Sequence, residues 1–132
     1  MPPTPPRILL IEDEELVYKT FADLYAPVAT IVTVTTLAEA EGIVETLANS
    51  FNIAVVDACL GGNIPNTLRL PSSLTKWGFK GTIVGFSSDP RYLPALRGAG
   101  CDQACHKTEI FRLVDRLLEL KPSSRPPPAN NL

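Results

Sequence analysis

The stretch Ile53-Ala54-Val55-Val56-Asp57-Ala58-Cys59-Leu60-Gly61-Gly62 runs four apolar residues into one aspartate and then a glycine pair. A run that is apolar at every position is typical of a central strand in a parallel sheet covered on both faces. Asp57 would then stand at the carboxyl end of the strand, the edge at which open α/β sheets bind ligands. Because a lone aspartate there is more often a turn or helix-cap residue, the ends of the other strands decide its interpretation.

Similar apolar runs alternate with segments of helical periodicity along most of the chain. Wholly apolar or β-branched runs predict strands at 7–11, 28–34, 53–57, 81–86 and 103–106. Apolar residues at helical spacing predict helices at 14–25, 37–47 and 72–77, a short one after Pro90, and a last one at 108–120. Five strands alternating with five helices predict an α/β fold, a doubly wound five-stranded parallel sheet in the order 2-1-3-4-5.

Two helix starts carry capping signals. Thr36 precedes the second predicted helix and Glu39 follows three residues later, which is the capping-box pattern. Asp89 precedes Pro90, so an N-cap is followed by proline at the first helical position.

The composition is that of one globular domain. The 132 residues are 45% apolar and 20% charged with a net charge of −2, which gives no sign of a nucleic-acid or membrane surface. Prolines concentrate at both ends, so we expect disordered tails at 1–6 and 121–132 around a single domain at 7–120. No signal peptide is recognisable, and three cysteines without metal-like spacing are typical of a reduced, cytoplasmic protein.

Polar residues stand at the carboxyl ends of four predicted strands: Glu12 and Asp13, Asp57, Ser87, and Lys107. In the expected strand order the three carboxylates share one crevice, where their mutual repulsion calls for a cation. Oxygen ligands alone favour Mg²⁺. One carboxylate could then accept a phosphoryl group, while the hydroxyl and the ammonium hold the remaining phosphoryl oxygens.

Each of these residues also has an ordinary interpretation. Glu12 and Asp13 could be solvated acids at a helix start, Ser87 a turn serine and Lys107 a surface lysine. His106, the only histidine, is interpreted as a strand-end residue. The metal interpretation is preferred because Asp57 would face the two acids from the neighbouring strand.

The motifs Ile11-Glu12-Asp13, Val56-Asp57 and Phe86-Ser87-Ser88, with Ala99-Gly100 followed by Lys107 seven residues later, resemble the receiver domain of two-component response regulators. The resemblance spans 7–120 and implies the fold of the chemotaxis regulator. It also implies roles for six residues: Asp57 as phosphoacceptor, Ser87 at the family's hydroxyl position, Lys107 as the partner of the phosphate, and Glu12 and Asp13 as Mg²⁺ ligands with Asp57 and the Cys59 carbonyl.

Three positions depart from the receiver pattern. Thr108 stands where a proline usually follows the lysine, which leaves the family's cis peptide in doubt. Ala104 stands where an aromatic ring usually moves inward on activation, so the usual aromatic switch cannot operate. Gly61 replaces a proline, and the Gly61-Gly62 pair predicts a mobile loop.

The leading hypothesis is therefore a single-domain response regulator. It would receive a phosphoryl group on Asp57, with Mg²⁺, from a histidine kinase or histidine phosphotransfer protein, and signal by contact with an unknown downstream protein or by phosphorelay. It would catalyse only its own phosphorylation and dephosphorylation, as a monomer or weak dimer. The alternative is a pseudo-receiver that docks partners without being phosphorylated; a flavodoxin-like or hydrolase enzyme is disfavoured because a phosphate-cradling glycine loop is missing.

Overall fold

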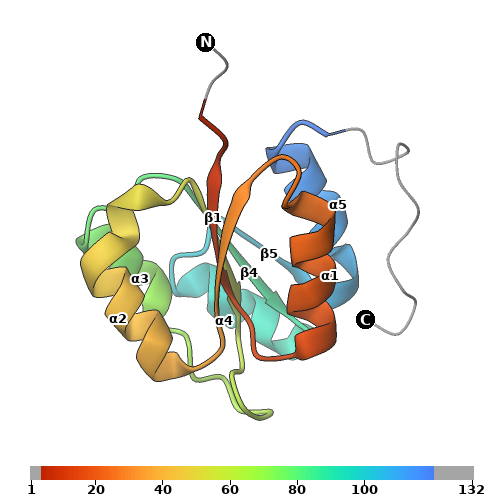
Figure 1. Ribbon diagram of the computed structural model, residues 1–132. Helices are drawn as coiled ribbons and strands as arrows, with labels where there is room; N and C mark the ends of the chain where they lie inside the picture. Colours follow the sequence, from red (N-terminus) through yellow and green to blue (C-terminus); the bar gives the residue numbers. More distant parts are fainter. Residues whose placement is uncertain (1–3, 121–132) are drawn as a thin grey trace.

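A five-stranded parallel sheet forms the centre of the molecule (Figure 1). The computed structural model describes residues 4–120, so residues 1–3 of the tail predicted at 1–6, and the whole tail predicted at 121–132, lie outside the described residues. The strands lie in the order β2-β1-β3-β4-β5, which confirms the predicted order 2-1-3-4-5. Their bounds are β1 Arg7–Ile11, β2 Thr30–Val34, β3 Ile53–Asp57, β4 Thr82–Ser87 and β5 Gln103–His106.

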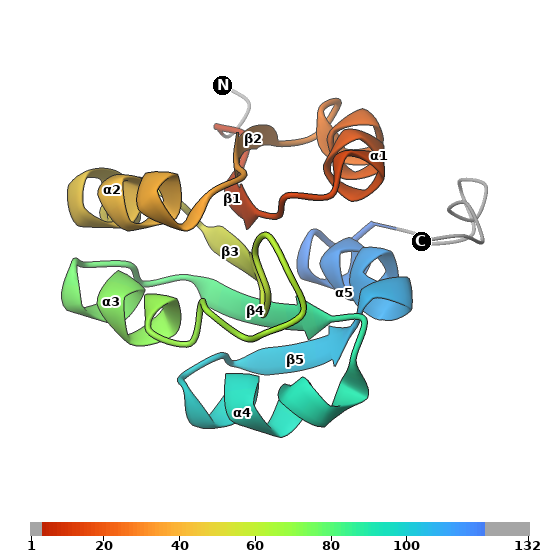
Figure 2. The same cartoon turned by 90° about the horizontal axis from the view of Figure 1, so that it is seen from below.

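Helices cover both faces of the sheet, as the wholly apolar strands require. Figure 2 shows α1 and α5 on one face and α2 and α3 on the other. Leu96 of α4 belongs to the same buried cluster as residues of α2 and α3, so these three helices share a core. The helix bounds are α1 Glu15–Tyr25, α2 Leu37–Leu47, α3 Leu70–Lys76, α4 Leu93–Gly98 and α5 Ile110–Leu117, with 3₁₀ turns at Ala48–Ser50, Pro90–Tyr92 and Lys107–Glu109.

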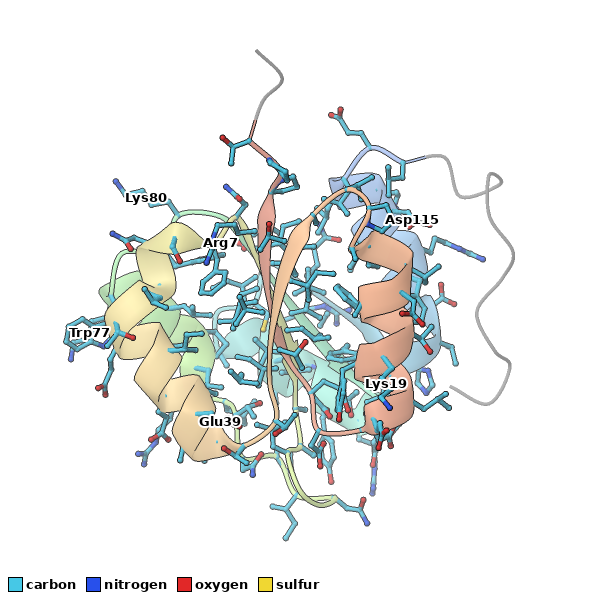
Figure 3. The ribbon with its side chains drawn as sticks, in the orientation of Figure 1. Arg7, Lys19, Glu39, Trp77, Lys80 and Asp115 are labelled. Atoms are coloured by element: carbon cyan, nitrogen blue, oxygen red, sulfur yellow. The ribbon has the colours of Figure 1, made fainter. Side chains whose placement is uncertain are left out.

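Both capping predictions are confirmed. The Thr36 hydroxyl accepts a hydrogen bond from the Glu39 backbone N–H at 3.2 Å, and the Glu39 carboxylate (labelled in Figure 3) accepts from the Thr35 N–H. Asp89 accepts from the Arg91 N–H at 3.0 Å, at the start of the 3₁₀ turn that precedes α4. These bonds satisfy backbone donors that the first turn of a helix leaves unpaired.

Several predicted bounds were wrong by a few residues. The third helix begins at Leu70 rather than at 72, because proline is tolerated in a first helical turn and the earlier start buries Leu70 and Leu74. The second strand begins at Thr30, and the last helix is divided into a 3₁₀ turn at Lys107–Glu109 and α5. Among residues 4–120, no helix combines the length and apolarity needed to cross a lipid bilayer.

Candidate functional site

Strands β1 and β3 bring their terminal acids to the same edge of the sheet. Ile11 pairs with Val56, so Glu12 and Asp57 follow at adjacent positions. Figure 2 looks onto this edge, where β4 and β5 end beside them. Ser87 is the last residue of β4. The strand order reverses between β1 and β3, and this switch point places the predicted residues around one crevice.

Three carboxylates converge at this edge. Glu12, Asp13 and Asp57 each offer an oxygen atom within 4.8 Å of the others. Glu12 is 0% and Asp57 2% exposed, whereas Asp13 is exposed. The Asp13 carboxylate accepts a hydrogen bond from the Gly61 N–H at 2.9 Å, which ties it to the loop after β3.

Lys107 lies among these carboxylates. Its Nζ is 3.2 Å from a Glu12 oxygen and 3.2 Å from an Asp57 oxygen, and the residue is only 7% exposed. Burial alone would lower the pKa of the Lys107 ammonium, but Glu12 and Asp57 outweigh it and raise that pKa. Lys107 therefore remains charged at neutral pH and offsets part of the negative charge.

One cation does not neutralise this cluster. Burial, together with the negative charge of Asp57, raises the pKa of Glu12 to about 8. Burial also raises the pKa of Asp57, against the opposing effect of Lys107. The environment therefore disfavours the charged form of Glu12 when no further cation is bound.

Ser87 and Cys59 border the same crevice, a cavity of about 500 Å³. Ser87 is buried, and its hydroxyl oxygen accepts a hydrogen bond from the Asp89 N–H at 3.0 Å. The Cys59 N–H donates to Asp57 at 3.1 Å, and burial raises the pKa of the Cys59 thiol. Of the residues predicted for the site, all but Glu12 line this crevice, and Glu12 lies buried beside Asp57 and Lys107.

Two residues that shape the loop after β3 were missed by sequence reasoning. The buried Thr67 hydroxyl donates to the Asp57 carbonyl at 2.6 Å. Asn66 accepts from the Leu60 N–H and donates to the Leu60 carbonyl, both at 2.8 Å. Both follow Pro65 in a segment without periodicity. Their side-chain contacts become apparent only when the folded loop brings them back to the end of β3.

A separate groove of about 440 Å³ lies between α2 and α3. Trp77 lines it, is 47% exposed and extends into solvent at the outer side of α3 in Figure 3. The groove lacks the converging buried charges of the strand-end crevice, so the chemistry belongs to the crevice.

The departures from the receiver pattern have structural counterparts. No cis peptide bond occurs within residues 4–120, so the bond between Lys107 and Thr108 is trans. Ala104 is half-buried and packs against the cluster that includes Leu96. The β5 position that carries an aromatic ring in receivers therefore contributes only a methyl group here.

Fold and site together define a doubly wound α/β domain with an acidic crevice at the carboxyl ends of its strands. No family model matches the sequence, and no curated protein matches it. Solved structures do: a response regulator from Burkholderia pseudomallei, solved with a phosphorylated aspartic acid and a calcium ion, has 18% identity and a TM-score of 0.70 over 83% of this chain. The match spans 65% of that protein's own chain.

Two further structures extend the comparison. A CheY-like receiver domain from Methanospirillum hungatei has 15% identity and a TM-score of 0.70, covering 88% of this chain and 95% of its own. The N-terminal domain of a three-domain response regulator from Carboxydothermus hydrogenoformans has 18% identity and a TM-score of 0.63. The match covers 86% of this chain and 94% of that domain's chain. The chain therefore has the fold of the response regulator receiver domain.

Proposed function

We propose that this protein is a phosphoacceptor receiver in which Asp57 takes a phosphoryl group from a phosphohistidine. The observation that carries the proposal is the convergence of Glu12, Asp13 and Asp57 on one crevice beside the buried ammonium of Lys107. A set of buried charges is costly to maintain for packing alone, because each ion loses its hydration. Perturbed titration in a cleft supports a chemical role.

The carboxylates fit a hard divalent cation such as Mg²⁺. Oε2 of Glu12 is buried and has no hydrogen-bond partner among the described residues. That oxygen could coordinate a bound Mg²⁺, which would offset the negative charge of the cluster. Its ligands would be Glu12, Asp13, Asp57 and the Cys59 carbonyl.

The transfer needs a free carboxylate oxygen aimed into the crevice. An oxygen of Asp57 attacks phosphorus, a P–O bond forms, the P–N bond of the phosphohistidine breaks, and its electron pair stays on the imidazole nitrogen. Lys107 and the Ser87 hydroxyl would hold phosphoryl oxygens as charge spreads over them. Lys107 would then exchange a carboxylate partner for the phosphoryl group.

The partners follow from this chemistry. A histidine kinase or histidine phosphotransfer protein would donate the phosphoryl group in the cytoplasm. A downstream protein would read the altered loops after β3 and β4, because both border the crevice. The domain catalyses its own phosphorylation and dephosphorylation and no other reaction.

The test is incubation of the full chain with acetyl phosphate and Mg²⁺, followed by intact-mass spectrometry. We expect the mass of one phosphoryl group to be added, and chelation of the metal to prevent the addition. The pseudo-receiver alternative would remain if the wild type gained no mass and if the Asp57→Asn variant bound beryllofluoride no differently from the wild type.

The raised pKa of Glu12 predicts how stability depends on pH without metal. Between about pH 5 and 8 the folded protein keeps a proton that the unfolded chain, with its glutamate at the ordinary value of 4.5, has released. The free energy of unfolding should therefore fall as pH rises, by roughly 1 kcal/mol per pH unit at most. Mg²⁺ should reverse the trend, because it binds the deprotonated carboxylate.

Urea unfolding at a series of pH values, in chelator and in excess Mg²⁺, measures this dependence. Glu12→Gln is the matched control, because its amide does not titrate and its metal-free curve should be flatter. A metal-free wild-type protein that becomes more stable from pH 5 to 8 would contradict the prediction.

A further inference from the structure

His106 connects the loop that follows Ser87 to the 3₁₀ turn that begins at Lys107. It is the last residue of β5 and pairs directly with Ser87 in the sheet. Its Nε2 lies 3.0 Å from the Ser88 carbonyl oxygen, and its Nδ1 lies 3.2 Å from the Thr108 backbone nitrogen. One half-buried ring thus spans the residue after Ser87 and the residue after Lys107.

The partners of the ring determine its tautomer. The Thr108 N–H can only donate, so Nδ1 must be the unprotonated, accepting nitrogen. The Ser88 carbonyl can only accept, so Nε2 must carry the proton. The Thr108 hydroxyl, 2.9 Å from Nδ1, donates to the same acceptor. Neutral His106 with its proton on Nε2 therefore satisfies both loops at once.

This arrangement depends on Thr108, the departure noted where receivers carry a proline. A proline has no backbone N–H, so at position 108 it would leave Nδ1 without its backbone donor. In this chain the His106 side chain caps the 3₁₀ turn Lys107–Glu109 through that N–H. The turn that holds Lys107 is thus fixed by a side chain instead of by a proline ring.

We propose that His106 is a positioning residue that holds the Ser87 hydroxyl and the Lys107 ammonium in register at the crevice that Asp57 lines. The inference rests on the proposed phosphoacceptor function. It assigns no contact between His106 and the phosphoryl group. Releasing the ring would let the two loops shift independently, and displacement of positioning groups by about 1 Å can slow a reaction by about a hundredfold.

Three substitutions distinguish the hydrogen bond to the Ser88 carbonyl from the one to the Thr108 N–H. His106→Phe keeps a ring but makes neither bond, whereas His106→Asn can still accept from the Thr108 N–H, as asparagine does at helix caps. We expect phosphoryl uptake from acetyl phosphate to be slowed about ten- to hundredfold by His106→Phe, at unchanged circular dichroism, and partly restored in His106→Asn. Adding Thr108→Pro should remove that restoration, because the donor is lost.

A spectroscopic measurement tests the geometry without any phosphorylation. The ¹⁵N shifts of His106 in the 132-residue chain should identify the neutral tautomer with hydrogen on Nε2. The opposite tautomer, or equal uptake rates in wild type, His106→Phe and His106→Asn, would overturn the inference while leaving the proposed function intact. Wild-type protein that takes up no phosphoryl group would overturn the proposed function and this inference with it.

Discussion

Asp57→Asn is expected to abolish phosphoryl uptake. An amide is a far weaker nucleophile than a carboxylate, and no other described acid in the crevice shares the position of Asp57, buried at the strand end and held by both Lys107 and the Cys59 N–H. Incubation with acetyl phosphate and Mg²⁺ should leave the mass of the variant unchanged while the wild type gains one phosphoryl group.

The fold should survive this substitution. The side-chain carbonyl of the introduced asparagine can still accept from the Cys59 N–H, and one buried negative charge beside Glu12 is removed. Asp23→Asn on the exposed side of α1 is the matched control and should be phosphorylated like the wild type. A phosphoryl group mapped to another crevice residue in Asp57→Asn would refute the assignment of the acceptor.

Gly81→Ala is expected to cause a large loss of stability. A Cβ at Gly81, just before β4, would lie 1.8 Å from the Asn52 carbonyl oxygen and 2.6 Å from its carbon. Both atoms belong to the backbone of the residue just before β3, and the same oxygen accepts from the Thr82 N–H. Because the sheet itself must shift to relieve the overlap, we expect a loss of about 3 kcal/mol or more in the free energy of unfolding.

Gly42→Ala provides the control for this prediction. Gly42 lies within α2, and a Cβ there would meet nothing within 4 Å. Alanine favours the helix over glycine by about 1 kcal/mol, so this variant should be more stable than wild type. Urea unfolding of the two variants measures both effects. Equal stability of Gly81→Ala and wild type would show that β3 and β4 approach less closely at this point.

The sheet order and the position of the acids could be predicted because they depend on local patterns. Apolar runs such as 53–56 mark buried strands, and short right-handed crossovers leave few strand orders. Once the order is known, residues that end neighbouring strands must meet, as Glu12 and Asp57 do. Helix bounds were less predictable, since Leu70 joins α3 only to complete the packing against the sheet.

The partners of the charged and polar side chains could not be predicted in this way. Lys107 was expected at the phosphate, and the structure adds its pairing with Glu12 and Asp57. His106 is the last residue of β5, as the sequence indicated, and the structure adds its bonds to both Ser88 and Thr108.

Local patterns along the chain were thus enough to establish the α/β architecture and the edge at which Asp57 stands, because periodicity and strand ends are properties of neighbouring residues. The packed fold was needed to show that burial raises the pKa of Glu12, that His106 links two loops and that Gly81 admits no side chain. These features depend on desolvation and on contacts between residues distant along the chain, and both arise only when the crossovers have packed against the sheet.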